Sequence, residues 1–125
     1  MPAFRLTAAV LGTPDPRGLA RFYQRLLGWP IRADEDDWAT LRPAEGGAGL
    51  SFQRETDHVP PVWPPVPGTQ QMQVHLDIEV DDLEAACTVA EAAGARPLGG
   101  HDDPDERVRV FADPAGHPLC LFAPT

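Results

Sequence analysis

The sequence predicts an α+β protein built from two βαβββ modules, and three observations lead to this fold. The chain contains one local pattern twice, in which a strand ends at an aspartate that can cap a helix and the helix ends at a glycine. Each helix is followed by three short segments with the composition of strands. A proline-rich segment separates the two copies.

The first copy carries strong helix signals. Asp15 stands where it can cap the helix, and Pro16 occupies the first helical position. Between Pro16 and Gly28, apolar side chains recur at spacings of three and four residues, so they form one stripe. Gly28 supplies the left-handed end of the helix. The strands expected in this copy are 8–15, 29–34, 38–42 and 49–54.

The second copy repeats the pattern with a different helix. Asp82 caps it and Gly94 ends it, so that the stretch from cap to glycine is one residue shorter than in the first copy. Its apolar stripe consists of Leu83, Ala86, Cys87, Ala90 and Ala93. Because these side chains are mostly small, we expect this helix to pack close to its sheet. The strands expected in this copy are 75–82, 96–100, 107–112 and 117–123.

The length of 125 residues fits a single domain. We place module one at about 4–55, a linker at about 56–70 and module two at about 71–123. The segment 59–67, VPPVWPPVP, cannot form a helix or a central strand, so it is interpreted as a stiff linker; a lid and a docking motif are the alternatives. Pairing the modules would cover the edges of each half-sheet. The expected result is one eight-stranded curved sheet around a cup, with the helices on the outer face.

Composition limits the partners. The formal charge is −9, and all ten basic residues are arginines. Nucleic acid and anionic membranes are therefore excluded as expected partners, whereas a cationic ligand would be attracted. The chain has neither a membrane-spanning apolar run nor a secretory leader pattern, so a cytoplasmic location is expected. Two cysteines are too few for a disulfide framework, and we expect both to be reduced.

The strand before the second helix carries an unusual set of polar residues. His75, Asp77 and Glu79 alternate with apolar residues, so the three should share one face and point toward the cup. They would form a polar wall that contacts a ligand. The alternative is that the two carboxylates hold the sheet together by pairing with Arg107 or Arg109. His75 is also a candidate general acid–base, because its pKa range suits that role.

Four segments of the chain carry a family resemblance. They are GTPDPRGLARFYQRLLGWP, LSFQRE, QMQVHLDIEVDDLEAACTVAEAAGARPL and VFADPAGHPLCLF. Together they resemble the vicinal-oxygen-chelate superfamily, which includes glyoxalase I, bleomycin-resistance proteins and extradiol dioxygenases. The nearest resemblance is to the short glyoxalase-like subgroup that is common in actinobacteria. The resemblance implies a homodimer and a small-molecule site.

The resemblance also implies a metal site, from which this chain departs. Metal-dependent members hold one divalent ion with four residues, and local spacing maps these to Ala8, Gln53, His75 and Cys120. Alanine has no donor atom, the glutamine is neutral and the thiol is soft. No metal cofactor is therefore expected. If a divalent ion is bound, His75, Gln53 and Cys120 would hold it.

Two classes of function follow from these residues. The first is a metal-free protein that binds a small organic molecule, for example to sequester a drug or metabolite. Its ligand would contact His75, Asp77, Glu79, Gln53, Cys120 and Ala8. The alternative is a lyase, isomerase or dioxygenase that uses a divalent metal or His75 as acid–base.

Several further residues are candidates for a role in such a site. Cys120 beside His75 is also a candidate nucleophile, although a buried apolar cysteine is the commoner case. Arg54, Arg107 and Arg109 are the arginines expected near the ligand, and a neutral-to-cationic ligand is preferred to an anionic one. Trp38, Phe52 and Trp63 are assigned to core packing or a subunit contact, with stacking on a ligand as the alternative. His117 is assigned to a structural turn, and His101 to a solvated turn, with metal binding as the alternative.

Overall fold

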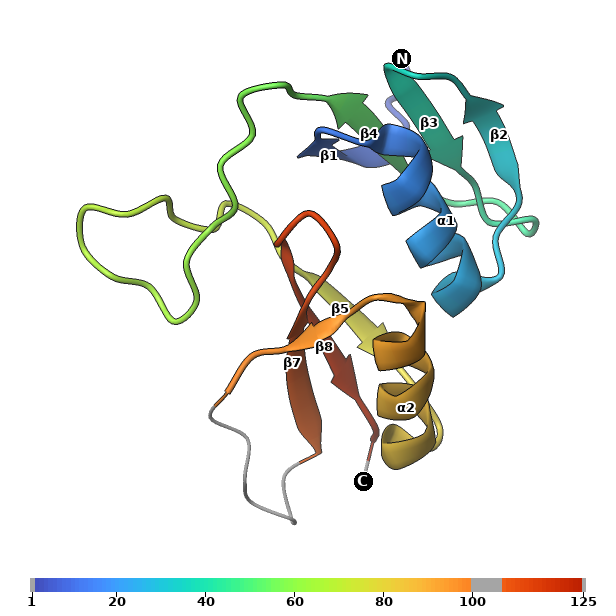
Figure 1. Ribbon diagram of the computed structural model, residues 1–125. Helices are drawn as coiled ribbons and strands as arrows, with labels where there is room; N and C mark the ends of the chain where they lie inside the picture. The colour runs from blue at the N-terminus through green and yellow to red at the C-terminus, as the bar shows by residue number, and fades with distance from the viewer. Residues whose placement is uncertain (1, 100–106, 125) are drawn as a thin grey trace. The chain divides into compact units, whose positions relative to one another are not determined.

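The computed structural model describes residues 2–99 and 107–124 (Figure 1). The chain divides into two compact units, Met1–His58 and Val59–Thr125. Each unit contains one βαβββ module, so the predicted class and the two-module organisation are confirmed.

In the first module the strand that opens the chain pairs with the strand that closes the module. The sheet order is β1-β4-β3-β2, with β1 parallel to β4 and the other neighbours antiparallel. Helix α1 lies against β3 and β4 (Figure 1). The elements in chain order are β1 (Ala8–Thr13), α1 (Pro16–Leu27), β2 (Ile31–Asp34), β3 (Trp38–Leu41) and β4 (Gly49–Arg54).

The second module has the same topology. Its order is β5-β8-β7-β6, again with the first strand parallel to the last. The elements are β5 (Leu76–Glu79), α2 (Leu83–Ala93), β6 (Arg96–Pro97), β7 (Val108–Ala112) and β8 (Pro118–Phe122). Backbone pairing of the described strands thus gives two four-stranded sheets that do not close into a barrel, where one eight-stranded sheet was expected. The difference arises because β1 and β5 each pair only within their own module.

Two strands are shorter than predicted from the sequence. The predicted strand 8–15 ends at Thr13, because the Thr13 side chain accepts a hydrogen bond from the Asp15 amide at 3.0 Å and turns the chain toward the helix. The predicted strand 96–100 is Arg96–Pro97, and residue 100 lies outside the described residues, as does His101. The segment 56–70 contains no helix or strand, in agreement with its proline content.

Helix α1 buries large side chains. Asp15 caps it by accepting a hydrogen bond from the Gly18 amide at 3.1 Å, and Gly28 ends it with φ of 72°. On its inner face Phe22 and Tyr23 are buried. The Tyr23 ring stacks on Phe52 of β4, with centroids 5.8 Å apart. The assignment of Phe52 to core packing is therefore confirmed, and α1 is anchored by aromatic contact.

Helix α2 packs less closely than expected. Asp82 caps it through the Ala85 amide at 3.1 Å, but Ala90 is the one helix residue that is buried. A cavity of about 260 Å³ lies between α2 and the β6–β7 end of the sheet, lined in part by Cys87, Leu98 and Phe111. Small side chains do not reach far enough to fill this space, so the predicted close packing holds only around Ala90. No helix in the described ranges is long and apolar enough to cross a membrane.

The close approach of β3 to β4 at Gly49 is testable. A methyl group at Gly49 would collide with the carbonyl oxygen of Leu41. Gly49→Ala should therefore lower the free energy of unfolding by about 1–3 kcal/mol, as overpacking generally does. Urea unfolding followed by circular dichroism measures the effect. Gly99→Ala is the control, because nothing lies within 4 Å of the methyl group it would add; identical midpoints for both variants would contradict the prediction.

Candidate functional site

Strand β5 presents a polar face and an apolar face. Asp77 and Glu79 are exposed, whereas Leu76 and Ile78 are half-buried. This alternation is the one predicted from the sequence. His75 precedes the strand and is exposed as well. We call His75, Asp77, Glu79 and their strand neighbour Cys120 the acidic face of the second module.

The parallel pairing of β5 with β8 brings Cys120 into this face. Its backbone lies directly opposite that of Asp77. The Nε2 atom of His75 is 3.2 Å from the Oδ1 atom of Asp77. One donor atom from each of His75, Asp77 and Cys120 lies within 4.8 Å of the other two. The structure thus brings together two residues of the implied metal set, His75 and Cys120, and adds Asp77 to them.

The Cys120 thiol is held in its protonated form. Burial raises the pKa of Cys120, and the charge of Asp77 and a hydrogen bond to that carboxylate raise it further. The protonated thiol donates this hydrogen bond, whereas a thiolate would face a like charge at short range. Because the thiolate is the nucleophilic form, this environment disfavours Cys120 as a catalytic nucleophile at neutral pH.

Arg109 lies on the opposite side of the sheet from Asp77. Its neighbour on β8 is the buried Leu121, and its Nη2 atom is 3.6 Å from Oε1 of Glu84 on α2. The suggestion that Arg109 neutralises the acidic face is therefore wrong, because strand alternation turns its side chain toward the helix. Within residues 2–99 and 107–124, no arginine lies at ion-pair distance from Asp77 or Glu79.

The first module offers a different set of groups at the corresponding positions. Ala8 on β1 has no donor, and the exposed Gln53 on β4 donates a hydrogen bond to Oε1 of Glu55 at 2.7 Å. In addition, the register revises one mapping. Val10 pairs with Ser51 as Asp77 pairs with Cys120, and both Val10 and Asp77 stand five residues before a helix cap.

Ser51, not Gln53, is therefore the structural counterpart of Cys120. The spacing was counted from Gly49, which is part of β4. The turn glycine that corresponds to Gly116, with φ of 92°, is Gly47, with φ of 94°. The hydroxyl of Ser51 is buried and lies 3.4 Å from that of Thr40.

These residues do not fit the four-ligand site that the family resemblance implies. The first module contributes an alanine and either a neutral amide or a hydroxyl. The second contributes an imidazole, a carboxylate and a thiol whose proton must leave before it binds a metal well. Three donors of mixed type on an exposed face are a poor match to a hard divalent ion.

The remaining candidates have structural environments. His117 Nδ1 lies 2.9 Å from Oδ2 of Asp113, and Oδ1 of the same carboxylate accepts hydrogen bonds from the amides of Ala115 and His117. The predicted structural turn at His117 is therefore confirmed. Trp38 and Trp63 are half-buried.

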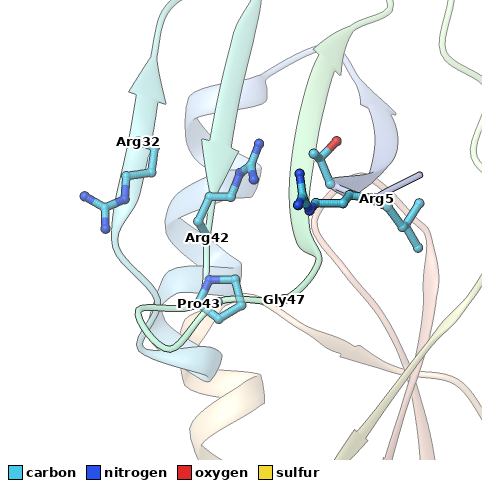
Figure 2. Close-up of a pocket in the computed structure, with 8 residues that line it drawn as sticks. Arg5, Arg32, Arg42, Pro43 and Gly47 are labelled. Atoms are coloured by element: carbon cyan, nitrogen blue, oxygen red, sulfur yellow. The ribbon is translucent and has the colours of Figure 1, made fainter. Parts of the chain in front are cut away.

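One feature of the first module was not predicted from the sequence. A cleft of about 710 Å³ is lined by three arginines, Arg5, Arg32 and Arg42 (Figure 2). They are far apart in the chain and lie in three different segments, so no local motif marks them. Because these arginines come together only in the folded chain, considering each strand separately does not predict the cleft.

Comparison with solved structures shows the same fold in several proteins. A glyoxalase/bleomycin resistance protein/dioxygenase family enzyme from Burkholderia phytofirmans PsJN is 19% identical, with a TM-score of 0.69 over 96% of this chain and 98% of that one. An antibiotic-binding protein from Streptomyces sp. CB03234 is 21% identical, with a TM-score of 0.64 over 100% and 99%. The bleomycin-binding protein of Streptomyces verticillus, solved with copper(II)-bleomycin, is 21% identical, with a TM-score of 0.61 over the whole of both chains. Identities this low establish the fold alone.

Comparison by sequence gives the family. No curated protein matches the chain. The family described as glyoxalase-like domain matches residues 8–122, which span both modules. The resemblance predicted from the sequence is thus confirmed, and the chain belongs to the glyoxalase-like domain family, within the vicinal-oxygen-chelate superfamily.

Proposed function

We propose that this protein binds a small neutral-to-cationic organic molecule at the acidic face of its second module, without a metal. The observation that carries the proposal is the pair of exposed carboxylates, Asp77 and Glu79, which no arginine of the described residues neutralises. Similar structures that bind an antibiotic and bleomycin support small-molecule binding as the class of function.

The charge of the whole module supports the same ligand sign. Residues 59–125 contain three arginines and eleven acidic residues, whereas residues 1–58 contain seven arginines and eight acidic residues. The acidity of the chain is thus concentrated in the half that carries the acidic face. A cationic ligand would be drawn to this half and held by direct pairing at Asp77 and Glu79.

The apolar surroundings would bind the body of the ligand. Phe122 lies opposite Glu79, and Val110 opposite Cys120, on the same face of the sheet. Carboxylates beside apolar side chains suit an amphipathic amine, whose charged end and apolar end both find partners.

Acid–base catalysis at His75 is the second candidate. The 3.2 Å contact between Nε2 of His75 and Oδ1 of Asp77 favours it, because a carboxylate at this distance can hold the orientation of an imidazole ring. In this alternative Asp77 is a positioning residue and His75 exchanges a proton with the substrate. Binding remains the first proposal, since the protonated thiol and the incomplete ligand set supply no second reactive group.

The ligand preference can be measured by isothermal titration calorimetry. A cationic aromatic amine such as 1-naphthylmethylamine should bind, and Asp77→Asn should weaken binding about fivefold, which corresponds to the roughly 1 kcal/mol of an exposed ion pair. Glu91→Gln removes the same charge from helix α2 and should change little. Added salt should weaken binding, because the face is open to solvent. Equal losses in the two variants, or an affinity for the amine that Asp77→Asn leaves unchanged, would argue against the acidic face.

Metal independence has a separate test. Elemental analysis of protein purified without chelators should show far less than one metal ion per chain. The reason is that Ala8 supplies no donor and the Cys120 thiol retains its proton. Stoichiometric zinc that disappears in Cys120→Ser but persists in Cys87→Ser would overturn this prediction and identify the His75, Asp77 and Cys120 donors as a site.

We further propose that the chain forms a homodimer. Strand β1 is an edge of its sheet, and two apolar side chains, Val10 on the strand and Phe4 in the segment before it, are 50% and 92% exposed. Such an edge is stabilised by a partner. Light scattering at micromolar concentration should give about twice the 13.5 kDa chain mass. Val10→Glu should shift this value toward the monomer, whereas Val89→Glu, at a similarly exposed position on α2, should not; a monomeric parent protein would refute the proposal.

A further inference from the structure

We propose that the first module contains an anion-binding cleft, separate from the acidic face, that takes the carboxylate or phosphate group of an organic anion. The cleft has a volume of about 710 Å³, within the range typical of small-molecule sites. Its walls come from the segment before β1, the arginine on β2, and the turn between β3 and β4. All of these residues belong to Met1–His58.

The charge of the lining is uniformly positive. Arg5, Arg32 and Arg42 are its ionisable residues, and no acidic residue lines it. Within the described part of the chain, none of these three guanidinium groups has an ion pair or a side-chain hydrogen bond. Glu45, three residues after Arg42 in the same turn, is exposed and is not part of the lining.

Two other arginines of this module, on helix α1, form ion pairs with carboxylates. Arg17 Nε is 3.2 Å from Asp34, and Arg17 Nη1 is 2.9 Å from Asp36. Arg21 Nη2 is 3.1 Å from Asp34. Asp34 and Asp36 thus pair with the arginines of α1, and among the described residues no carboxylate pairs with the arginines of the cleft.

The guanidinium groups of the cleft are suited to recognise an anion. Figure 2 shows Arg5, Arg32 and Arg42 on neighbouring segments of the module, with the guanidinium group of Arg32 directed away from the other two. Because like charges repel, an anion bound in the cleft would lower its electrostatic energy. The planar forks of the guanidinium groups match the oxygens of a carboxylate or phosphate, each able to donate two parallel hydrogen bonds.

The remaining walls define the rest of the ligand. Leu6, 79% exposed, and Pro43 line the cleft beside the arginines. Gly46 and Gly47 have φ of 92° and 94°, and nothing lies within 4 Å of the position that a side chain would take. These glycines leave the turn open to close approach by a ligand. An acidic group attached to an apolar or aromatic body therefore fits the cleft.

A series of naphthalene compounds with one shared body tests the proposal. Calorimetry with 1-naphthyl phosphate, 1-naphthoate and neutral 1-naphthol should show one-to-one binding of the two anions and at least tenfold weaker binding of the alcohol. The comparison of phosphate with carboxylate identifies the preferred head group. Equal affinity for all three compounds would show an apolar surface without anion recognition, and would overturn the proposal.

The variants test the geometry. Arg5→Gln and Arg42→Gln should each weaken anion binding at least fivefold, whereas Arg25→Gln on α1, outside the cleft, should change it less than twofold. Circular dichroism and the Tm verify folding, which the cleft arginines should not affect because they lack partners. Asp77→Asn should leave anion binding unchanged, so this cleft and the acidic face can fail independently. Equal losses in all three arginine variants would reduce the effect to net charge and refute the site.

Discussion

The parallel pairing of the first strand of each module with its last strand is the constraint on which the rest of the structure depends. It places β1 beside β4 and β5 beside β8, so that residues about forty positions apart share one surface. In the second module this pairing puts Asp77 next to Cys120, where burial raises the pKa of the thiol and the carboxylate raises it further. In the first module the same pairing puts Val10 next to Ser51. One topology thus generates a polar face in one copy and a largely apolar one in the other.

The two modules also differ in how their helices are anchored. Helix α1 stacks Tyr23 on Phe52 and buries several large side chains, whereas α2 buries Ala90 and leaves a cavity at its side. Aromatic burial contributes much more to the free energy of folding than alanine burial does. The first sheet is therefore the better packed of the two. Duplicated topology does not require equal packing, because the cap and the terminal glycine set the helix length while the side chains between them set the depth of the core.

The fold was predictable because its signals are local. Asp15, Asp82, Gly28 and Gly94 mark helix ends through hydrogen bonds and dihedral angles that depend only on their neighbours. The alternation of polar and apolar residues in β5 was equally predictable. The register between strands was not, because the pairing of Ser51 with Val10 depends on which glycine of the turn adopts the left-handed conformation, and the sequence offers Gly46, Gly47 and Gly49 at that point.

The site was less predictable than the fold for a related reason. Arg109 does not pair with the acidic face because the register sets it opposite Leu121, whereas Asp77 lies opposite Cys120 on the other face of the sheet, and this register is not marked by any local signal in the sequence. The cleft of Arg5, Arg32 and Arg42 carries no motif at all. Its positive character follows from what its neighbours do, since Asp34 and Asp36 are already paired with the arginines of α1.

The acidic face connects the metal chemistry of the superfamily to the ligand proposed here. Carboxylates on the open face of a sheet lower the electrostatic energy of any cation that approaches, whether an ion or an amine. A divalent ion needs several donors to replace its water shell, and at position 8 the alanine supplies none. An organic cation needs only one or two carboxylates and an apolar surface for its body, which Asp77, Glu79 and Phe122 supply. The lack of a donor at Ala8 therefore disfavours a divalent ion but leaves the negative potential of the carboxylates, which is the basis of the proposed preference for a cationic organic molecule.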